Sequence, residues 1–226
     1  MKHITILAWI ILSLNCIPFL SFSQSWSSHY EKMITYYNAT DYDNAVKEGE
    51  KCVQLFNEEI SQQDTNYANI LNYLCYSYYG LNNLEKAIEY GEQERNIRNQ
   101  FQGNKNLQYL SGTFYLGTFY LNLEKYDKAQ TYLEEVATTF AQLYGINNDF
   151  YISAASYLAY LHNLLNHYKE AEYYYLEMYN YYDSLYDEDD QNLQEIINLV
   201  ATFYIKFKAY DKAEPFFINA VDYLKR

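Results

Sequence analysis

The feature that most constrains the fold is an alanine that recurs every 42 residues along the chain. It occupies five positions: Ala45, Ala87, Ala129, Ala171 and Ala213. Further columns keep the same phase, and those nine and three residues before each alanine are mostly tyrosine. A fixed period of this length indicates structural repeats that stack into a solenoid, because each unit buries its apolar face only against its neighbours.

Residues 108–149 illustrate how one period is expected to fold. Apolar residues at three- and four-residue steps run from Leu110 to Leu121 and again from Ala129 to Phe140, which predicts two amphipathic helices. The whole chain has only two prolines and seven glycines, a composition that favours long helices over turn-rich β structure. We therefore predict an all-α chain of helical hairpins.

The period divides the chain into a short leader and five repeats. The leader is expected at 1–23, and the repeats are expected at 24–65, 66–107, 108–149, 150–191 and 192–226.

Most repeats carry a small residue, most carry a tyrosine three residues later, and most carry Tyr-Asp/Glu-x-Ala nine to twelve residues later. In the third repeat these are Gly117, Tyr120 and the segment 126–129. The pattern resembles the tetratricopeptide repeat (TPR) and covers residues 25–226, while the 42-residue period resembles the longer-helix form of kinesin light chain. The resemblance implies a right-handed α-solenoid of five helix-turn-helix repeats, with a concave face lined by the first helix of each pair, in a protein of exported bacterial type.

Two departures from that pattern matter. Kinesin-light-chain-like repeats usually carry an asparagine ladder that holds a ligand backbone, but here the column reads Glu31, Tyr73, Tyr115, Tyr157 and Leu199. Its binding mode therefore does not transfer.

In addition, Gly49 and Gly91 stand where the later repeats have Leu133, Tyr175 and Phe217. The first two helix pairs could therefore pack either more closely or more loosely than the others.

The N-terminal segment predicts export. A short basic start at Lys2 precedes an apolar stretch from Ile4 to Leu14, and small residues end at Ser23. This order is typical of a signal peptide, so we predict cleavage after Ser23 and a periplasmic or extracellular protein. An uncleaved membrane anchor over the same segment is the alternative, and it would be the chain's only membrane contact.

The charge and the residue types exclude several functions. A formal net charge of −13 offers no basic footprint for nucleic acid. The chain has no phosphate-binding glycine loop, no nucleophile elbow and no zinc-protease motif, and His162 and His167 are five residues apart, off a common helix face. We therefore expect no enzyme activity, no cofactor and no metal site. Cys52 and Cys75 are interpreted as buried thiols, with a disulfide as the alternative.

The thirty tyrosines exceed what the repeat columns use, and exposed tyrosines favour recognition. The concave columns of the resembled family, projected onto this chain, give a neutral Tyr/Asn-rich set. The candidate protein- or peptide-binding residues are Asn69, Asn72, Tyr76, Tyr79, Phe114, Thr118, Asn122, Ser156, Tyr160, Asn163, Asn198 and Thr202. The lysine and arginine clamp with which some TPR proteins hold a terminal carboxylate is not found among them.

The leading hypothesis is a non-enzymatic exported scaffold that binds a protein or peptide. One alternative is the N-terminal sensor or adaptor region of a larger exported or membrane protein with a CHAT-type protease or signalling kinase. Another is a glycan-binding module. An apolar stripe near the C-terminus, formed by Phe217, Ala220, Val221 and Leu224, also suggests self-association, because solenoid ends normally carry a polar cap.

Overall fold

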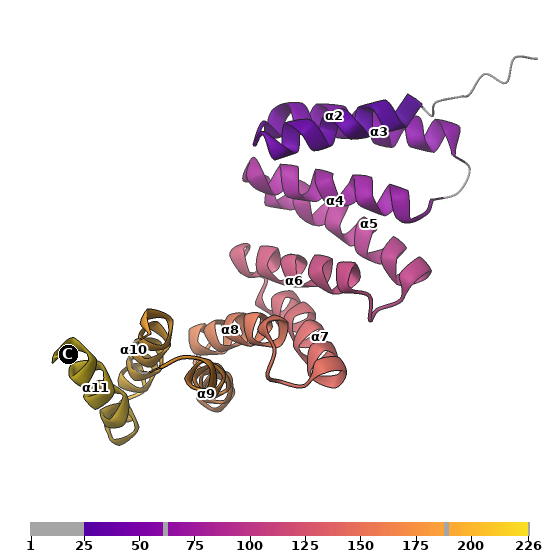
Figure 1. The fold of residues 1–226 in the computed structure, drawn as a ribbon. Helices are drawn as coiled ribbons and strands as arrows, with labels where there is room; N and C mark the ends of the chain where they lie inside the picture. Colours follow the sequence, from indigo (N-terminus) through magenta and orange to yellow (C-terminus); the bar gives the residue numbers. More distant parts are fainter. Residues whose placement is uncertain (1–24, 61–62, 188–189, 226) are drawn as a thin grey trace, which may run out of the picture.

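The computed structural model describes residues 25–60, 63–187 and 190–225, with side chains up to Ile218 (Figure 1). The predicted leader at 1–23 lies outside these residues, as do the side chains of Ala220, Val221 and Leu224 in the C-terminal stripe. All regular structure in the described part is α-helical, in consecutive hairpins. The first helices are α2 (Ser25–Asn38), α4 (Thr65–Gly80), α6 (Leu107–Asn122), α8 (Asp149–Leu164) and α10 (Gln191–Lys206). The second helices are α3 (Tyr42–Glu59), α5 (Leu84–Gln102), α7 (Tyr126–Tyr144), α9 (Tyr168–Leu185) and α11 (Tyr210–Lys225).

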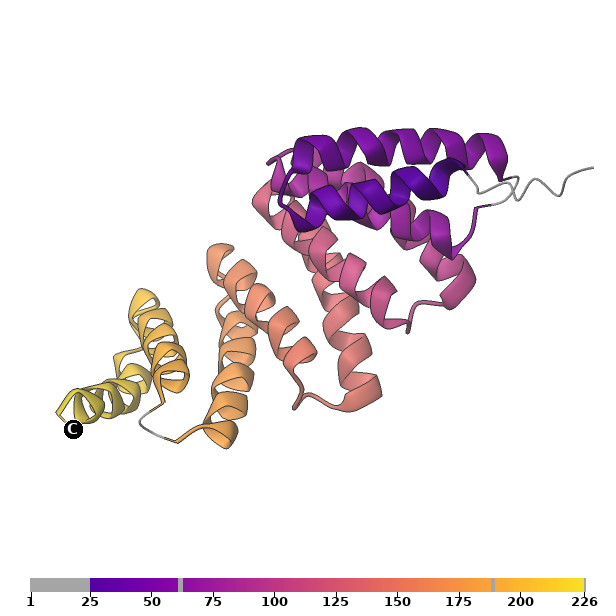
Figure 2. The same ribbon diagram turned by 45° about the horizontal axis from the view of Figure 1, so that its top comes forward.

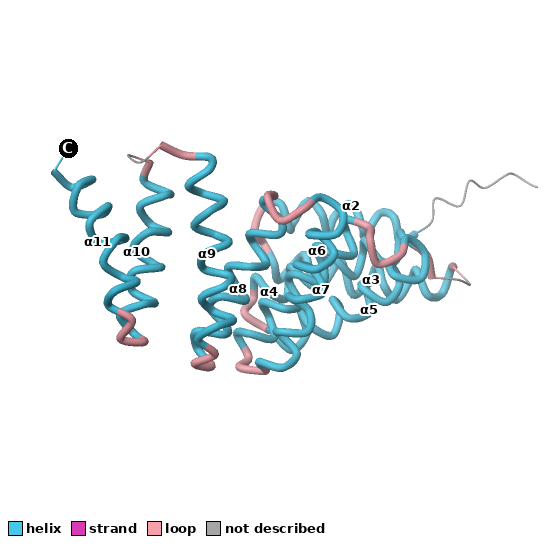
Figure 3. The backbone as a smooth tube through the Cα atoms, turned by 90° about the horizontal axis from the view of Figure 1, so that it is seen from below, coloured by secondary structure: helices cyan, strands magenta, loops and turns pink. Residues whose placement is uncertain are grey.

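The hairpins stack into a solenoid, as the period predicts, and it is right-handed, as the resemblance implies. Figure 1 shows the stack sweeping through an arc, with α4, α6, α8 and α10 on its inner side and α5, α7 and α9 on its outer side. The turned views show that successive hairpins also rotate, so the arc is part of a superhelix (Figures 2 and 3). The inner face is therefore built almost entirely by first helices.

The turn inside each hairpin repeats the same backbone conformation. One residue per turn has positive φ, between 57° and 61°, and none of these is glycine: Thr40, Asn82, Glu124, Asn166 and Lys208. In the third turn the Lys125 N–H donates to the Tyr120 carbonyl at 2.9 Å, which closes the end of α6. The left-handed position of each turn, which glycine adopts most readily, is therefore occupied by other residues.

The entry to first helices is periodic too. Side chains cap the N-termini of α4, α6, α8 and α10 by accepting backbone N–H bonds. The capping residues are Asp64, Asn106, Asn148 and Asp190, again 42 residues apart.

A glycine allows the two helices to approach closely in both the second and the third repeat. In the second repeat, a Cβ on Gly91 would come within 3.3 Å of Cys75 Sγ and 3.0 Å of Leu116. In the third repeat the roles reverse, and a Cβ on Gly117 would lie 2.8 Å from Leu133 Cγ. The glycine moves from the second helix to the first, so both hairpins pack closely and neither tolerates a second large side chain.

Many tyrosines stack in pairs between the two helices of a repeat. Tyr120 and Tyr132 lie parallel with centroids 5.5 Å apart, and both hydroxyls donate to Glu92 of the preceding repeat, at 2.9 and 2.6 Å. Tyr78 and Tyr90 stack in the same way in the second repeat. Burial and the acceptor carboxylate raise the pKa of Tyr120 and Tyr132. These tyrosines link repeats and leave a smaller set for recognition.

Cys52 and Cys75, which lie in the described part of the chain, are buried free thiols, in agreement with the favoured interpretation. Cys52 Sγ donates to the Trp26 carbonyl at 3.2 Å, and burial raises the pKa of Cys52 to about 12.

Candidate binding groove on the inner face

Aromatic rings run along the inner face from one first helix to the next. Edge-to-face pairs with centroids 5.0–5.4 Å apart bridge α2 to α4, α4 to α6, and α6 to α8. They are Tyr37 with Tyr73, Tyr76 with Tyr115, and Phe114 with Tyr157. Three of these tyrosines occupy the column in which the asparagine ladder is missing. We call these paired rings the aromatic line. The 42-residue spacing of Tyr73, Tyr115 and Tyr157 is its signal in the sequence, and none of the three was among the candidate residues.

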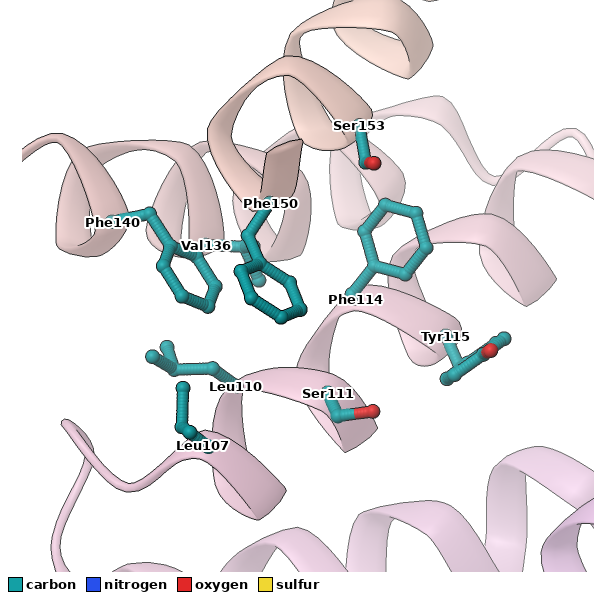
Figure 4. A pocket seen from close by; sticks show the side chains of 9 residues that line it. All are labelled: Leu107, Leu110, Ser111, Phe114, Tyr115, Val136, Phe140, Phe150 and Ser153. Carbon is teal, nitrogen blue, oxygen red and sulfur yellow. The ribbon is translucent and has the colours of Figure 1, made fainter. Parts of the chain in front are cut away.

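An apolar cavity of about 240 Å³ opens beside this line, between α6, α7 and the start of α8 (Figure 4). Phe140 and Phe150 stack on one side of it, with centroids 4.8 Å apart, and Figure 4 shows Phe114 across from them. The lining residues are Leu107, Leu110, Ser111, Phe114, Tyr115, Val136, Phe140, Phe150 and Ser153. The polar side chains that line this cavity are Ser111, Ser153 and Tyr115, each with a hydroxyl group.

A polar hollow of about 460 Å³ lies next to it, between α2, α4, α5 and α6. Its lining residues are Tyr30, Asn69, Asn72, Tyr73, Tyr76, Arg98, Gln108 and Ser111. Ser111 is exposed and lines both spaces, so the apolar cavity and the polar hollow adjoin each other at this residue. We call the two together the groove.

The structure brings four of the candidate residues to the groove. Asn69, Asn72 and Tyr76 line the polar hollow, and Phe114 lines the apolar cavity. Burial raises the pKa of Tyr76, which packs against Tyr115.

The other candidates lie elsewhere. Thr118 is buried and donates its hydroxyl to the Tyr115 carbonyl, which takes it out of the inner surface. Tyr79 stacks on Phe119 and is 46% exposed, while Tyr160 is 54% exposed. Ser156 and Asn163 are half-buried, and Asn163 accepts a hydrogen bond from Lys206 at 2.8 Å. Asn122, Asn198 and Thr202 are exposed outside both spaces.

Sequence reasoning missed several residues of the groove, among them Gln108, Ser111 and, least expected, Arg98. Arg98 belongs to α5, a second helix, and only 4% of its side chain is exposed where it reaches the polar hollow. It pairs with Glu94, whose side chain is 1% exposed. Burial raises the pKa of Glu94, and the hydrogen bond and charge of Arg98 act in the opposite direction. The only signal was two charged residues in columns that are apolar in neighbouring repeats.

No group of three or more His, Cys, Asp or Glu side chains suited to a metal occurs in the described part of the chain. The turn at Asn166 nevertheless brings His162 and His167 together, with their Nδ1 atoms 3.3 Å apart. His162 lies in the last turn of α8 and His167 is the N-cap residue of α9, so the positions of residues around a single helix do not describe how far apart they are. Within the described ranges, no helix has the length and apolar character needed to cross a membrane.

Comparisons with known proteins bear on the repeat. A family model described as tetratricopeptide repeat matches residues 109–184, which span α6 to α9. Two of the helical hairpins, α6–α7 and α8–α9, therefore match the tetratricopeptide repeat in sequence.

Solved structures show the same fold over nearly the whole chain. The nearly identical TPR-like repeats of a kinesin light chain from Podosopora anserina match with a TM-score of 0.72 and 14% identity, over 89% of this chain and 95% of that one. BtubC (BKLC) from P. vanneervenii matches with a TM-score of 0.70 and 18% identity, over 85% and 77%. A search of curated protein sequences found no match.

A third similar structure contains a ligand. The Rap conjugation gene regulator of the plasmid pLS20, in complex with the Phr* peptide, matches with a TM-score of 0.55 and 14% identity. The match covers 92% of this chain and 57% of the regulator. The TM-scores of these three structures show that the chain shares a TPR-like fold with them.

Proposed function

We propose that this chain is a non-enzymatic scaffold that binds an extended peptide segment of a partner protein in the groove. The observation that carries the proposal is that the apolar cavity and the polar hollow adjoin each other at Ser111. Together they offer space for a bulky apolar side chain beside amide and hydroxyl groups for a peptide backbone. Sites that bind ligands commonly combine an apolar pocket with a few placed polar groups.

Two further points support a peptide. The aromatic line continues from the groove along α4, α6 and α8, and Tyr115 and Tyr157 are 39% and 38% exposed. Rigid exposed tyrosines give a large contact area at low entropic cost. In addition, a similar TPR-like fold, the Rap regulator, holds the Phr* peptide.

The export of the scaffold is part of the proposal and rests on residues 1–23. A fusion of these residues to alkaline phosphatase, which is active only outside the cytoplasm, should give an active enzyme. Mass spectrometry of the full chain expressed in a bacterium should find an N-terminus at Gln24. An intact N-terminus in the membrane fraction would favour the anchor, and an inactive fusion would contradict export.

Binding is tested with a random dodecapeptide library displayed on phage and selected on the immobilised full chain. Selected peptides should bind the wild type and lose most of their affinity for Ser111→Trp, because the indole fills the junction of the two spaces. The matched control is Ser184→Trp, an exposed serine on α9, and it should bind as the wild type does.

Equal binding by the Ser111 and Ser184 variants would contradict the groove assignment. If no peptide is selected but an array of neutral oligosaccharides gives Ser111-dependent binding, the groove is a glycan site instead.

A further inference from the structure

The second repeat buries an ion pair where its neighbours bury apolar side chains. Glu94 and Arg98 lie seven and eleven residues after Ala87. The corresponding residues are Cys52 and Phe56 in the first repeat, Val136 and Phe140 in the third, and Met178 and Tyr182 in the fourth. The apolar alternative is therefore compatible with the fold at this place.

A second substitution, in the next repeat, accommodates the pair. A Cβ on Gly112 of α6 would lie 2.5 Å from Glu94 Oε2, so in this position the carboxylate occupies space that a larger residue would take. The neighbouring repeats have Ile70 and Ala154 in the same column. A buried ion pair is often no more stabilising than an apolar pair of similar volume. Two coordinated changes that bring little stability call for another role.

The contacts of Arg98 indicate that role. Its guanidinium donates to Asn69 Oδ1 at 2.9 Å, to Gln102 Oε1 at 3.1 Å and to Gln108 Oε1 at 3.4 Å. Arginine has no acceptor atom, so it holds the carbonyl oxygen of each amide toward itself. The NH₂ groups of Asn69 and Gln108 are then turned away from it, and both residues line the polar hollow.

We propose that Arg98, held by Glu94, is a positioning residue that fixes the amides of Asn69 and Gln108, so that the polar hollow presents N–H donors to main-chain carbonyls of the bound peptide. This inference rests on the proposed function. The charge of the ion pair indicates which acceptor the peptide provides. Because Glu94 and Arg98 are neutral as a pair, the hollow offers hydrogen-bond donors without a net positive charge. Neutral carbonyl oxygens match that better than carboxylates do.

The first test needs no ligand. The triple variant E94V/R98F/G112A installs the residues of Val136, Phe140 and Ala154 and should keep the helical circular dichroism of the wild type. Side-chain amide NMR of the full chain should show dispersed resonances for Asn69 and Gln108 in the wild type and averaged ones in the triple variant. R98K, which keeps the charge without the fork, should also average them. Unchanged resonances in both variants would overturn the positioning role.

The second test uses the peptides selected on the wild type. Their affinity should fall by about tenfold in the triple variant, the loss of one to two hydrogen bonds. Replacement of single peptide amides by esters, which weakens a carbonyl acceptor, should identify one position that matters to the wild type and not to the triple variant.

The outcomes separate the two proposals. Peptides that bind both proteins equally, or an ester scan with the same profile in both, would overturn the inference and leave the scaffold function intact. A dependence on peptide carboxylates instead of carbonyls would overturn the assigned acceptor class. Failure to select any peptide would contradict the scaffold function, and the amide resonances would then decide the positioning role alone.

Discussion

The second and third repeats place different chemistry on the same backbone. Between α5 and α6 the chain buries Glu94 and Arg98, whereas between α7 and α8 the same columns hold Val136 and Phe140. The glycine of the helical hairpin also changes sides, from Gly91 on the second helix to Gly117 on the first. The comparison shows that the backbone of a repeat keeps its shape when two facing residues change together, even though the residue types differ between repeats.

The difference also divides the groove. The polar hollow adjoins the buried ion pair of the second repeat, and the apolar cavity adjoins the phenylalanines of the third. The charged residues Glu94 and Arg98 of a second helix thus change the chemistry of a surface that first helices mainly form.

The largest expected effect comes from breaking the ion pair on one side only. Arg98→Met leaves the Glu94 carboxylate buried without its partner and should lower the free energy of unfolding by about 3–5 kcal/mol. E94V/R98F/G112A, which copies the neighbouring repeats, should stay within about 1 kcal/mol of the wild type. Urea denaturation followed by circular dichroism measures both, and a single variant as stable as the triple one would contradict the comparison.

A smaller effect is expected where the glycine changes sides. Gly117→Leu places a second large side chain against Leu133 and should cost about 1–3 kcal/mol. Leu133→Ala makes room for the new side chain. The double variant should therefore lose less free energy of unfolding than the two single variants lose together, by about 0.5–3 kcal/mol. Additive costs in a double-mutant cycle would show that the two residues do not share one space.

The turns allow a finer comparison. Glu124 adopts the left-handed conformation in the third repeat and Asn82 does so in the second. Glu124→Gly should stabilise the chain by about 0.5–1 kcal/mol, because glycine removes the steric cost of this conformation. Asn82→Gly should gain less, since asparagine tolerates positive φ better. Thermal melts of the two variants decide it, and a larger gain at Asn82 would contradict this account.

The smallest effect concerns pH. His162 replaces the tyrosine found at Tyr78 and Tyr120, and burial, then the charge of His167, lowers its pKa, against the pull of Glu170 and Glu134. Neutral His162 is favoured in the folded state, so this stabilisation is complete above the ordinary histidine pKa of about 6.5 and declines as the pH falls below it. His162→Tyr should lose that decline in melting temperature between about pH 7 and pH 5. The same pH slope in both proteins would refute the assignment.

The sequence was sufficient for the fold because the repeat is dense with local signals. The alanine column, the apolar steps from Leu110 to Leu121 and the scarcity of glycine predict helical hairpins, and the structure has them. The turn was harder to predict, because the left-handed residue is not glycine and only its hydrogen bonds reveal it.

The groove was only partly predictable. Asn69, Asn72, Tyr76 and Phe114 lie on first helices and follow from the period, but Thr118 is turned inward by its place on α6. Arg98 escaped notice because an inner face was expected to come from first helices alone. Its reach depends on side-chain length and on the space left by Gly112, which is a property of packing and not of spacing.

The reciprocal glycines limit how such an array can be shortened. Excision of residues 84–125 would keep the 42-residue phase, yet it would set Cys75 against Leu133, two side chains in a place where the second and third hairpins each have a glycine. Excision of residues 66–107 removes a matched pair together and leaves every remaining hairpin with its own partner. The unit that can be lost or duplicated is therefore the helical hairpin with its joints between repeats, although both cuts preserve the same periodicity.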